Sequence, residues 1–306
     1  MRVLAIIATL LVTGTACAYE TDQFSNRLQP LEDSTQVLNA RVNQSIADIV
    51  TQWRGKRDDS RFVDKVYFDI GGRHWVDKLE SWAMKSPEVD RLATPRRESI
   101  YAGHPLWATR VAALFGVGPT IKVNDQLIGS DKLGHFLSQG RKFWRRWLRY
   151  RDEAQAAEQS AFTERALFGQ LTTGSYSNAD LVANFEGYRF YRSLFEDNVV
   201  PGKPAILAWR DGGWIVQRPF DFADHVNAYW DEAINVNDYD ALLYEHMRQR
   251  LEGFCVDFRA EPAAWSLQDE AALKQRYADL QLRDTSDMRL ERLCHEGGAQ
   301  VAGRGK

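Results

Sequence analysis

Cysteine, long apolar segments and familiar catalytic motifs are all scarce in this chain. Only three of its 306 residues are cysteines, and none has the Cys-x-x-Cys spacing of a redox or zinc motif. After the first few residues, no apolar run approaches the roughly 18 to 20 residues that a membrane helix needs. No nucleophile elbow, phosphate loop, dinucleotide fingerprint or His-Glu-x-x-His pair is present either. The sequence therefore excludes a transmembrane segment and gives no motif support for the common hydrolase, nucleotide-binding or zinc-protease chemistries.

The N-terminus has the pattern of an export signal. Arg2 provides a positive start, an apolar run follows from Val3 to Val12, and Ala16-Cys17-Ala18 is a small-residue cleavage sequence before Tyr19. We expect residues 1–18 to be removed and the remaining chain to be periplasmic, in the envelope of a bacterium.

The three cysteines leave two questions open. Cys17 would be the lipidated residue of a lipoprotein signal, but Gly14 stands where such signals carry a large aliphatic residue, which favours ordinary cleavage. Cys255 and Cys294 remain after cleavage. An oxidising compartment would allow them to form a disulfide, and the alternative is two buried thiols that never meet.

The composition favours no particular partner. Removal of residues 1–18 takes away Arg2, so the net charge of −3 becomes −4, and a charge of this size selects neither nucleic acid nor an anionic surface. Export also argues against nucleic acid. An envelope component is the expected partner, and the oligomeric state does not follow from the sequence.

We predict a mainly α fold, a helical bundle with two small β-hairpins. No linker or repeat divides residues 19–295, which we interpret as one domain with its core bundle at about 120–235, and the polar tail 296–306 is expected to be disordered. The turn residues Asn124-Asp125 and Asp211-Gly212-Gly213 predict the hairpins. Apolar periodicity and breaking residues predict helices at about 31–53, 73–85, 105–115, 131–149, 152–171, 179–196, 238–253, 267–281 and 285–294. We interpret the charged stretch Lys56-Arg57-Asp58-Asp59 as the break that ends the first of them.

The three consecutive helices that begin near residues 131, 152 and 179 predict a polar site. Short connections make neighbouring helices antiparallel, so the first and third run parallel and begin at the same end. This brings Asp131 and His135 close to Asp180 and Asn184. Gly187 would allow a neighbouring helix to approach closely. The end of the second helix could line the same space with Glu164, Gln170 and the turn Thr172-Thr173-Gly174-Ser175.

The residue types in this set suit acid–base chemistry or metal binding. Asp131 and His135 are four residues apart and share a helix face, where a carboxylate would orient the imidazole as a base or ligand. Lys132 is a third of a turn away and is expected to point elsewhere, although with Asn184 it could hold an anionic or carbonyl group. No cofactor or metal identity follows from these residues.

Structural interpretations of the same residues stay open. Ser130 or Asp131 could cap the first helix, and Ser177 or Asn178 could cap the third. The whole set could equally form a buried hydrogen-bond network that joins three helices without any substrate.

A second Asp-x-x-x-His occurs at Asp221 and His225. With Asp231 and Glu232 nearby, this stretch could complete a metal site or form a second wall of the pocket. The competing interpretation is an ordinary acidic helix face.

Two short patterns resemble the VanZ-like proteins and related small bacterial envelope proteins. They are Asp-Lys-x-x-His-Phe at 131–136 and Asp-Leu-x-x-Asn-x-x-Gly at 180–187, and the resemblance covers about residues 129–195. It implies that the defining polar residues are Asp131, Lys132, His135, Asp180 and Asn184. VanZ-like proteins are membrane-embedded, whereas the helices here carry charged residues where a bilayer would require apolar ones, namely Arg145, Arg146, Arg149 and Glu164. The resemblance implies the polar site without the membrane setting, and no reaction.

Two functions remain as hypotheses. In the first, the protein is an envelope enzyme that performs hydrolysis or transfer, with His135 as base or metal ligand and Asp131 orienting it. In the second, it is a non-catalytic envelope protein that binds a glycan, lipid or protein, and the polar residues form a structural network. An open cleft would favour the first, and sealed, mutually bonded side chains would favour the network.

Overall fold

The computed structural model describes residues 20–72, 76–104, 116–163 and 174–295. In these ranges the fold is mainly helical with small two-stranded sheets, as predicted. The expected export signal, the helix at 105–115 and the tail at 296–306 lie outside them. None of the helices described is both long and apolar enough to cross a bilayer.

The helices have the bounds α2 (Thr35–Gln52), α3 (Asp59–Ile70), α4 (Lys78–Ala83), α6 (Asp131–Gly134), the π-helical segment η2 (His135–Gln139), α7 (Gly140–Tyr150), α8 (Glu153–Thr163), α10 (Asn178–Ser193), α11 (Tyr244–Glu252), α12 (Cys255–Ala260) and α13 (Glu270–Arg276). Short connections join the helices from α6 to α8, whereas long segments separate α4 from α6 and α10 from α11. Short 3-10 segments connect some of them, namely η4 (Phe222–Asp224), η5 (Ala228–Trp230), η6 (Pro262–Trp265), η7 (Ala278–Leu280) and η8 (Ser286–Met288).

The strands form four separate pairs. The two predicted hairpins are present and antiparallel: β3 (Thr120–Val123) with β4 (Gln126–Gly129), and β6 (Leu207–Arg210) with β7 (Gly213–Val216). Two pairs between distant segments were not predicted: the parallel pair β1 (Glu20–Thr21) with β2 (Val117–Gly118), and the antiparallel pair β5 (Ser175–Tyr176) with β8 (Asp238–Tyr239).

Helix α3 is the principal element that the sequence analysis missed. The charged stretch at 56–59 was interpreted only as the end of the preceding helix. In fact Asp58 is an N-cap, whose side chain accepts a hydrogen bond of 2.8 Å from the backbone N–H of Arg61. Phe62 and Val66 then lie on the buried face of the new helix. A charged break can therefore start a helix as well as end one.

The central helices have the relative directions that the sequence predicted. His135, just before α7, lies 3.0 Å from Asn184 near the start of α10, and Trp144, nine residues later, lies 6.4 Å between ring centroids from Tyr191. The segment from η2 to α7 and helix α10 therefore run in the same general direction. Tyr188 donates a hydrogen bond of 2.9 Å to Glu153 at the start of α8, which therefore runs the opposite way.

Two glycines bring α7 and α10 into backbone contact. A side-chain carbon on Gly187 would lie 1.9 Å from the carbonyl oxygen of Phe136, and one on Gly140 would lie 2.6 Å from the α-carbon of Gly187. Neither position has room for a larger residue. The predicted role of Gly187 in close helix approach is confirmed.

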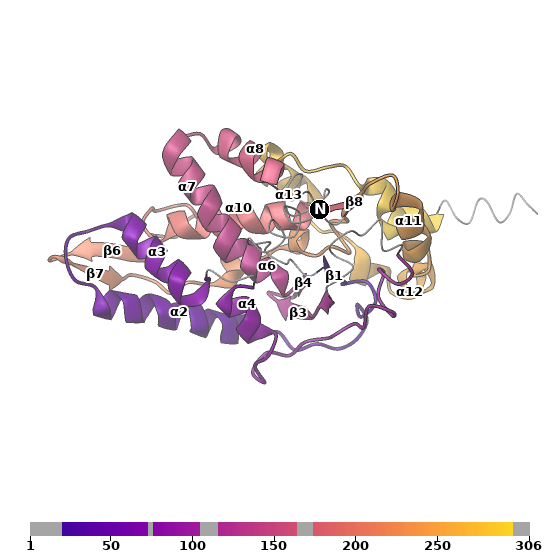
Figure 1. Ribbon diagram of the computed structural model, residues 1–306, viewed down its shortest axis with the longest axis horizontal. Helices are drawn as coiled ribbons and strands as arrows, with labels where there is room; N and C mark the ends of the chain where they lie inside the picture. The colour runs from indigo at the N-terminus through magenta and orange to yellow at the C-terminus, as the bar shows by residue number, and fades with distance from the viewer. Residues whose placement is uncertain (1–19, 73–75, 105–115, 164–173, 296–306) are drawn as a thin grey trace, which may run out of the picture.

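The molecule is elongated, and its apolar interior forms more than one cluster. Figure 1 shows α2, α3 and the hairpin β6–β7 towards one end and α11 with α12 at the other. The larger cluster unites α2, α3, α7 and α10. A smaller one, which we call the C-terminal core, packs Phe24 and Ile100 against residues of α11 and α12, including Met247.

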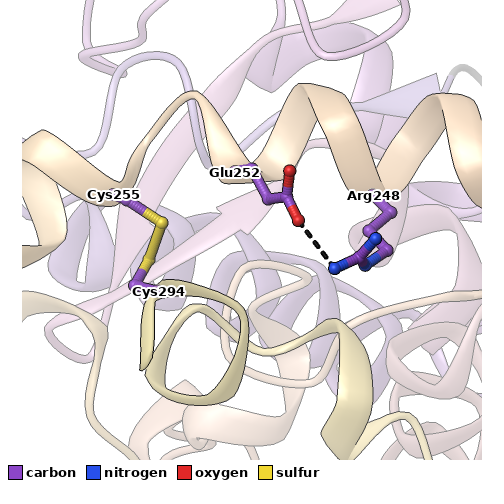
Figure 2. Close-up of a disulfide and its surroundings, with 4 residues drawn as sticks. All are labelled: Arg248, Glu252, Cys255 and Cys294. Atoms are coloured by element: carbon purple, nitrogen blue, oxygen red, sulfur yellow. Dashed lines mark ion pairs between the residues drawn. A yellow bond between two sulfur atoms is a disulfide. The ribbon is translucent and has the colours of Figure 1, made fainter. Parts of the chain in front are cut away.

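A disulfide closes the C-terminal core. Cys255 at the start of α12 is bonded to Cys294, 39 positions away in sequence. Of the two alternatives for these cysteines, the disulfide is therefore correct and the pair of separate thiols is not. Figure 2 shows this bond beside α11, where Arg248 and Glu252 form an ion pair of 2.9 Å.

Removal of the disulfide should destabilise the protein without changing its fold. The double variant Cys255→Ser, Cys294→Ser gains loop entropy in the unfolded state, and we expect its unfolding free energy to fall by about 4 kcal/mol. Urea denaturation of both proteins measures the difference. Two free thiols in unreduced, denatured wild-type protein would contradict the bond itself.

Gly187→Ala should be far more damaging than its size implies, because the new methyl group meets a backbone oxygen that cannot move alone. We expect a loss of about 3 kcal/mol or more. Gly116→Ala is the matched control, because no atom of the described residues lies within 4 Å of its side-chain position. Equal melting temperatures for the two variants would contradict the backbone contact.

Candidate metal centre

The site begins where β4 passes into α6 at Asp131. The helix widens into a π turn from His135 to Gln139 before regular helix resumes in α7. Such turns hold an extra residue and are frequent at functional sites. The backbone contact between α7 and α10 then places the first turns of α10 against α6 and η2.

Lys132 lies at the centre of the site, not away from it as predicted. Its Nζ is 2.7 Å from each of three carboxylate oxygens: Asp131 Oδ2, Asp180 Oδ1 and Glu232 Oε1. The prediction was wrong because the position of a residue along a helix fixes only the direction of its Cβ atom. Beyond that atom, the long lysine side chain can bend towards a region of strongly negative potential. With three carboxylates around its ammonium group, Lys132 is a structural counter-ion and is poorly placed to hold an anionic substrate group.

His135 lies between Asp180 and Asn184, as the sequence predicted. Its Nδ1 is 3.0 Å from Asn184 Oδ1, and the amide nitrogen of Asn184 donates to Ser160 Oγ at 3.4 Å. This assignment of the amide makes Asn184 Oδ1 an acceptor, so the imidazole proton resides on Nδ1. His135 Nε2 then faces Asp180 Oδ2 at 3.3 Å.

Either a proton or a metal ion must lie between His135 Nε2 and Asp180 Oδ2, because an unprotonated ring nitrogen and a carboxylate oxygen both accept hydrogen bonds. A charge-assisted hydrogen bond from a protonated imidazole would normally measure about 2.7–2.9 Å. Two ligands that each lie about 2.0–2.1 Å from a tetrahedral zinc ion are about 3.3 Å apart, which matches the distance between His135 Nε2 and Asp180 Oδ2. The geometry of this pair therefore fits a metal better than a proton.

Asp131 supplies a third ligand atom. One ligand atom from each of Asp131, His135 and Asp180 lies within 4.8 Å of the other two. Asp131 Oδ2 contacts Lys132, but Oδ1 is buried with no hydrogen-bond partner among the described residues. A buried carboxylate oxygen without a partner is costly, and a bound cation would offset that cost.

Charge and burial oppose one another at every group of the site. Burial alone would lower the pKa of Lys132, but Asp131, Asp180 and Glu232 outweigh it and hold the pKa well above its ordinary value. Burial would raise the pKa of Asp180, and His135 and Lys132 reverse this to a net lowering. The pKa values of Asp131 and Glu232 stay raised, because burial outweighs the attraction of Lys132.

Further carboxyl groups surround the centre, and the sequence analysis missed them. Burial, followed by the charges of Glu232 and Asp180, raises the pKa of Glu20 to about 7. Burial raises the pKa of Asp77 to about 6, although Ser138 donates to both of its oxygens. Neither residue belongs to a recognisable motif. The only signal in the sequence is that each of these carboxyl residues stands apart from the apolar residues of its own segment.

Glu232 joins the first site, whereas the second Asp-x-x-x-His does not converge. Asp221 caps η4 through the backbone N–H of Ala223 at 3.0 Å. His225 Nδ1 lies 3.1 Å from Glu186 Oε2 of α10 instead. Asp221 and His225 therefore form no metal site of their own in the described structure. Of the alternatives left open, a wall of the first site is the one that this stretch provides, through the carboxylate of Glu232, which also accepts a hydrogen bond from Ser177.

A side-chain cap of the kind predicted is present at the start of α10 but not at the start of α6. Ser177 caps α10, since its side chain accepts a hydrogen bond of 3.1 Å from the backbone N–H of Asp180. Ser130 makes no such bond at the start of α6. Of the other residues expected to line the site, Glu164, Gln170, Thr172 and Thr173 lie outside the described ranges, and Gly174 and Ser175 lie at the start of β5.

The centre is buried. Asp131, His135, Asp180 and Asn184 are between 3% and 7% exposed, and Lys132 is 1% exposed. Sealed and mutually bonded side chains are what the structural-network hypothesis expects. The unpartnered oxygen of Asp131 and the 3.3 Å separation of His135 Nε2 from Asp180 Oδ2 are not what a completed network expects.

The buried carboxyl of Glu20 should make stability depend on pH. Its pKa is 4.5 in an unfolded chain and about 7 in the fold, so the folded state binds more protons between these values and loses stability as pH rises through them. Each unit corresponds to about 1.4 kcal/mol, which gives a loss of about 3 kcal/mol across the window. Glu20→Gln keeps the shape and removes the titration.

Urea denaturation of chelator-treated protein between pH 5 and pH 8 measures this effect. The stability of the wild type should fall relative to that of Glu20→Gln as pH rises. Parallel profiles for the two proteins would show that Glu20 titrates normally.

Comparison of the chain with protein-family models, curated proteins and solved structures finds no match. The resemblance to VanZ-like proteins therefore stays a prediction, and the geometry of the centre is the basis for any function.

Proposed function

We propose that this chain is an exported protein of the bacterial envelope that binds one divalent transition metal at Asp131, His135 and Asp180. Zinc is the ion that fits best. Held by these three residues, the metal would supply an activated water for hydrolysis or group transfer on an envelope component.

One observation carries the proposal. His135 Nε2 and Asp180 Oδ2 face each other at 3.3 Å, a separation that two ligands of one tetrahedral metal would have, and Asn184 holds the imidazole in this orientation. Hydrogen bonds from the opposite ring nitrogen are the usual means by which proteins orient histidine ligands. Asn184 is thus a positioning residue, and Asp180 and His135 are the ligands.

The charge balance supports a divalent ion. The ionised forms of Asp131, Asp180 and Glu232 carry three negative charges, and Lys132 returns one positive charge. Two negative charges are then left in a buried site, where an uncompensated charge is strongly unfavourable. One divalent cation neutralises them, whereas the alternative is proton uptake by Asp131 and Glu232.

The number of ligands supports chemistry more than a purely structural ion. Structural zinc sites are closed by four protein ligands, whereas catalytic sites have three and keep a position for water. A metal lowers the pKa of such a water to about 7. Glu232, held by Lys132 at 2.7 Å, is a further buried carboxylate beside the ligand set and would act on that water as a proton acceptor.

The second candidate is a structural lock, which the burial of the centre favours. In this case Lys132 and its three carboxylates fix α6, α10 and the segment after η5, and protons supply the missing charge. The two candidates differ in one measurable quantity, the metal content.

Elemental analysis with native mass spectrometry tests the proposal. We expect one zinc per chain in wild-type protein isolated with zinc, and a loss of at least about tenfold in affinity for Asp131→Asn, His135→Gln and Asp180→Asn. Asp221→Asn and His225→Gln are the matched controls, because this second Asp-x-x-x-His does not converge. Both should keep the metal.

Substitution with cobalt tests the role of the metal. A four-coordinate Co(II) site with one water should give visible absorption bands that titrate near pH 7 in the wild type and disappear in His135→Gln. Full occupancy without this titration would restrict the metal to a structural role. Wild-type protein that binds neither zinc nor cobalt would leave only the structural lock.

A further inference from the structure

Two histidines and a methionine meet at the C-terminal core, away from the centre described above. His104 Nε2 lies 2.9 Å from Met247 Sδ. The rings of His104 and His246 are 4.5 Å apart between centroids. The chain reaches His104 through Gly103, whose φ of +74° is a left-handed conformation that glycine adopts without strain. His246 and Met247 are neighbours on α11.

The donor atoms of this cluster are incompletely satisfied. Burial, followed by the neighbouring His246, lowers the pKa of His104 to about 4, so the imidazole of His104 is uncharged near neutral pH. His104 Nδ1 is buried with no partner among the described residues. His246 Nε2 donates a hydrogen bond of 3.1 Å to the carbonyl oxygen of Ala102, so Nδ1 is the ring nitrogen of His246 that remains to bind a ligand. Because a thioether is a weak hydrogen-bond acceptor, the close approach of His104 to Met247 is poorly explained by hydrogen bonding alone.

We propose that His104, His246 and Met247 bind one monovalent soft cation, Cu(I). Thioether sulfur selects Cu(I) over harder ions, and imidazole is a good ligand for copper. No thiol described in the structure competes for the ion, because Cys255 and Cys294 are joined in the disulfide.

The surrounding charges favour one positive charge over two. Arg96 and Arg250 both lie close enough to lower the pKa of His104, and Arg250 is fixed by a hydrogen bond of 2.8 Å to the carbonyl oxygen of Ser99. Their repulsion grows in proportion to the charge of the bound ion. A divalent ion with neutral ligands is therefore disfavoured here, in contrast to the centre at His135.

Binding requires only a small adjustment. A copper ion about 2.0 Å from nitrogen and about 2.3 Å from sulfur, at a tetrahedral angle, places the two ligand atoms about 3.5 Å apart. Met247 must then withdraw by about half an ångström, which its flexible side chain permits. His246 is partly exposed and provides the route of entry.

Competition with a chromogenic Cu(I) chelator tests the site. The probe is Cu(I) kept reduced by ascorbate, which leaves the disulfide intact, and the protein is the full exported chain. We expect one Cu(I) per wild-type chain, and affinity reduced by at least about tenfold in Met247→Leu and in His246→Gln. Met288→Leu is the matched control, because Met288 is also buried in the C-terminal core.

The outcomes separate this site from the first. His135→Gln should bind Cu(I) as the wild type does, whether or not the zinc proposal holds. Wild-type protein that fails to compete with the chelator would overturn the assignment, and so would equal affinities for Met247→Leu and Met288→Leu. The melting temperatures of the two methionine variants show whether a loss of Cu(I) affinity comes from unfolding. If it does, the affinity of His246→Gln, a change at a partly exposed position, decides whether the site binds Cu(I).

Discussion

The buried ammonium of Lys132 is the interaction on which the arrangement of the centre depends. A charged amine in the interior is tolerated only when carboxylates surround it, and these come from α6, α10 and the segment after η5. The three segments are thereby fixed relative to one another. Such clusters add little stability compared with apolar packing, but they specify position. Here Lys132 also occupies Oδ1 of Asp180, so that Oδ2 of Asp180 faces His135.

Much of this arrangement could be predicted because it follows from local rules. Turn residues identified both hairpins, and short connections gave the parallel directions of α7 and α10. Those directions were sufficient to bring His135 to Asp180 and Asn184 across 49 residues of sequence. Gly187 was identified from its spacing, and its backbone contact is what allows that approach.

The remainder depends on contacts that no local rule encodes. Glu232 reaches Lys132 across 100 residues, and Glu20 belongs to a strand that pairs with β2, far along the chain. The direction of Lys132 was wrong because its side chain follows the electrostatic potential of residues whose positions were unknown. Helix α3 was missed for a different reason: Asp58 was interpreted as a terminator when its side chain caps the next helix.

Three buried histidines show that the electrostatic surroundings, rather than sequence spacing, decide what each can do. His225 has the same Asp-x-x-x-His spacing as His135, yet it contacts Glu186, which Arg276 also neutralises at 2.6 Å. That cluster therefore has no excess negative charge to attract a cation. His135 lies among excess negative charge and can serve a divalent ion. His104 lies among positive charge, so only a weakly charged ion with a preference for sulfur can join it. One chain thus offers sites of opposite character, because each site's net charge selects the charge of its ligand.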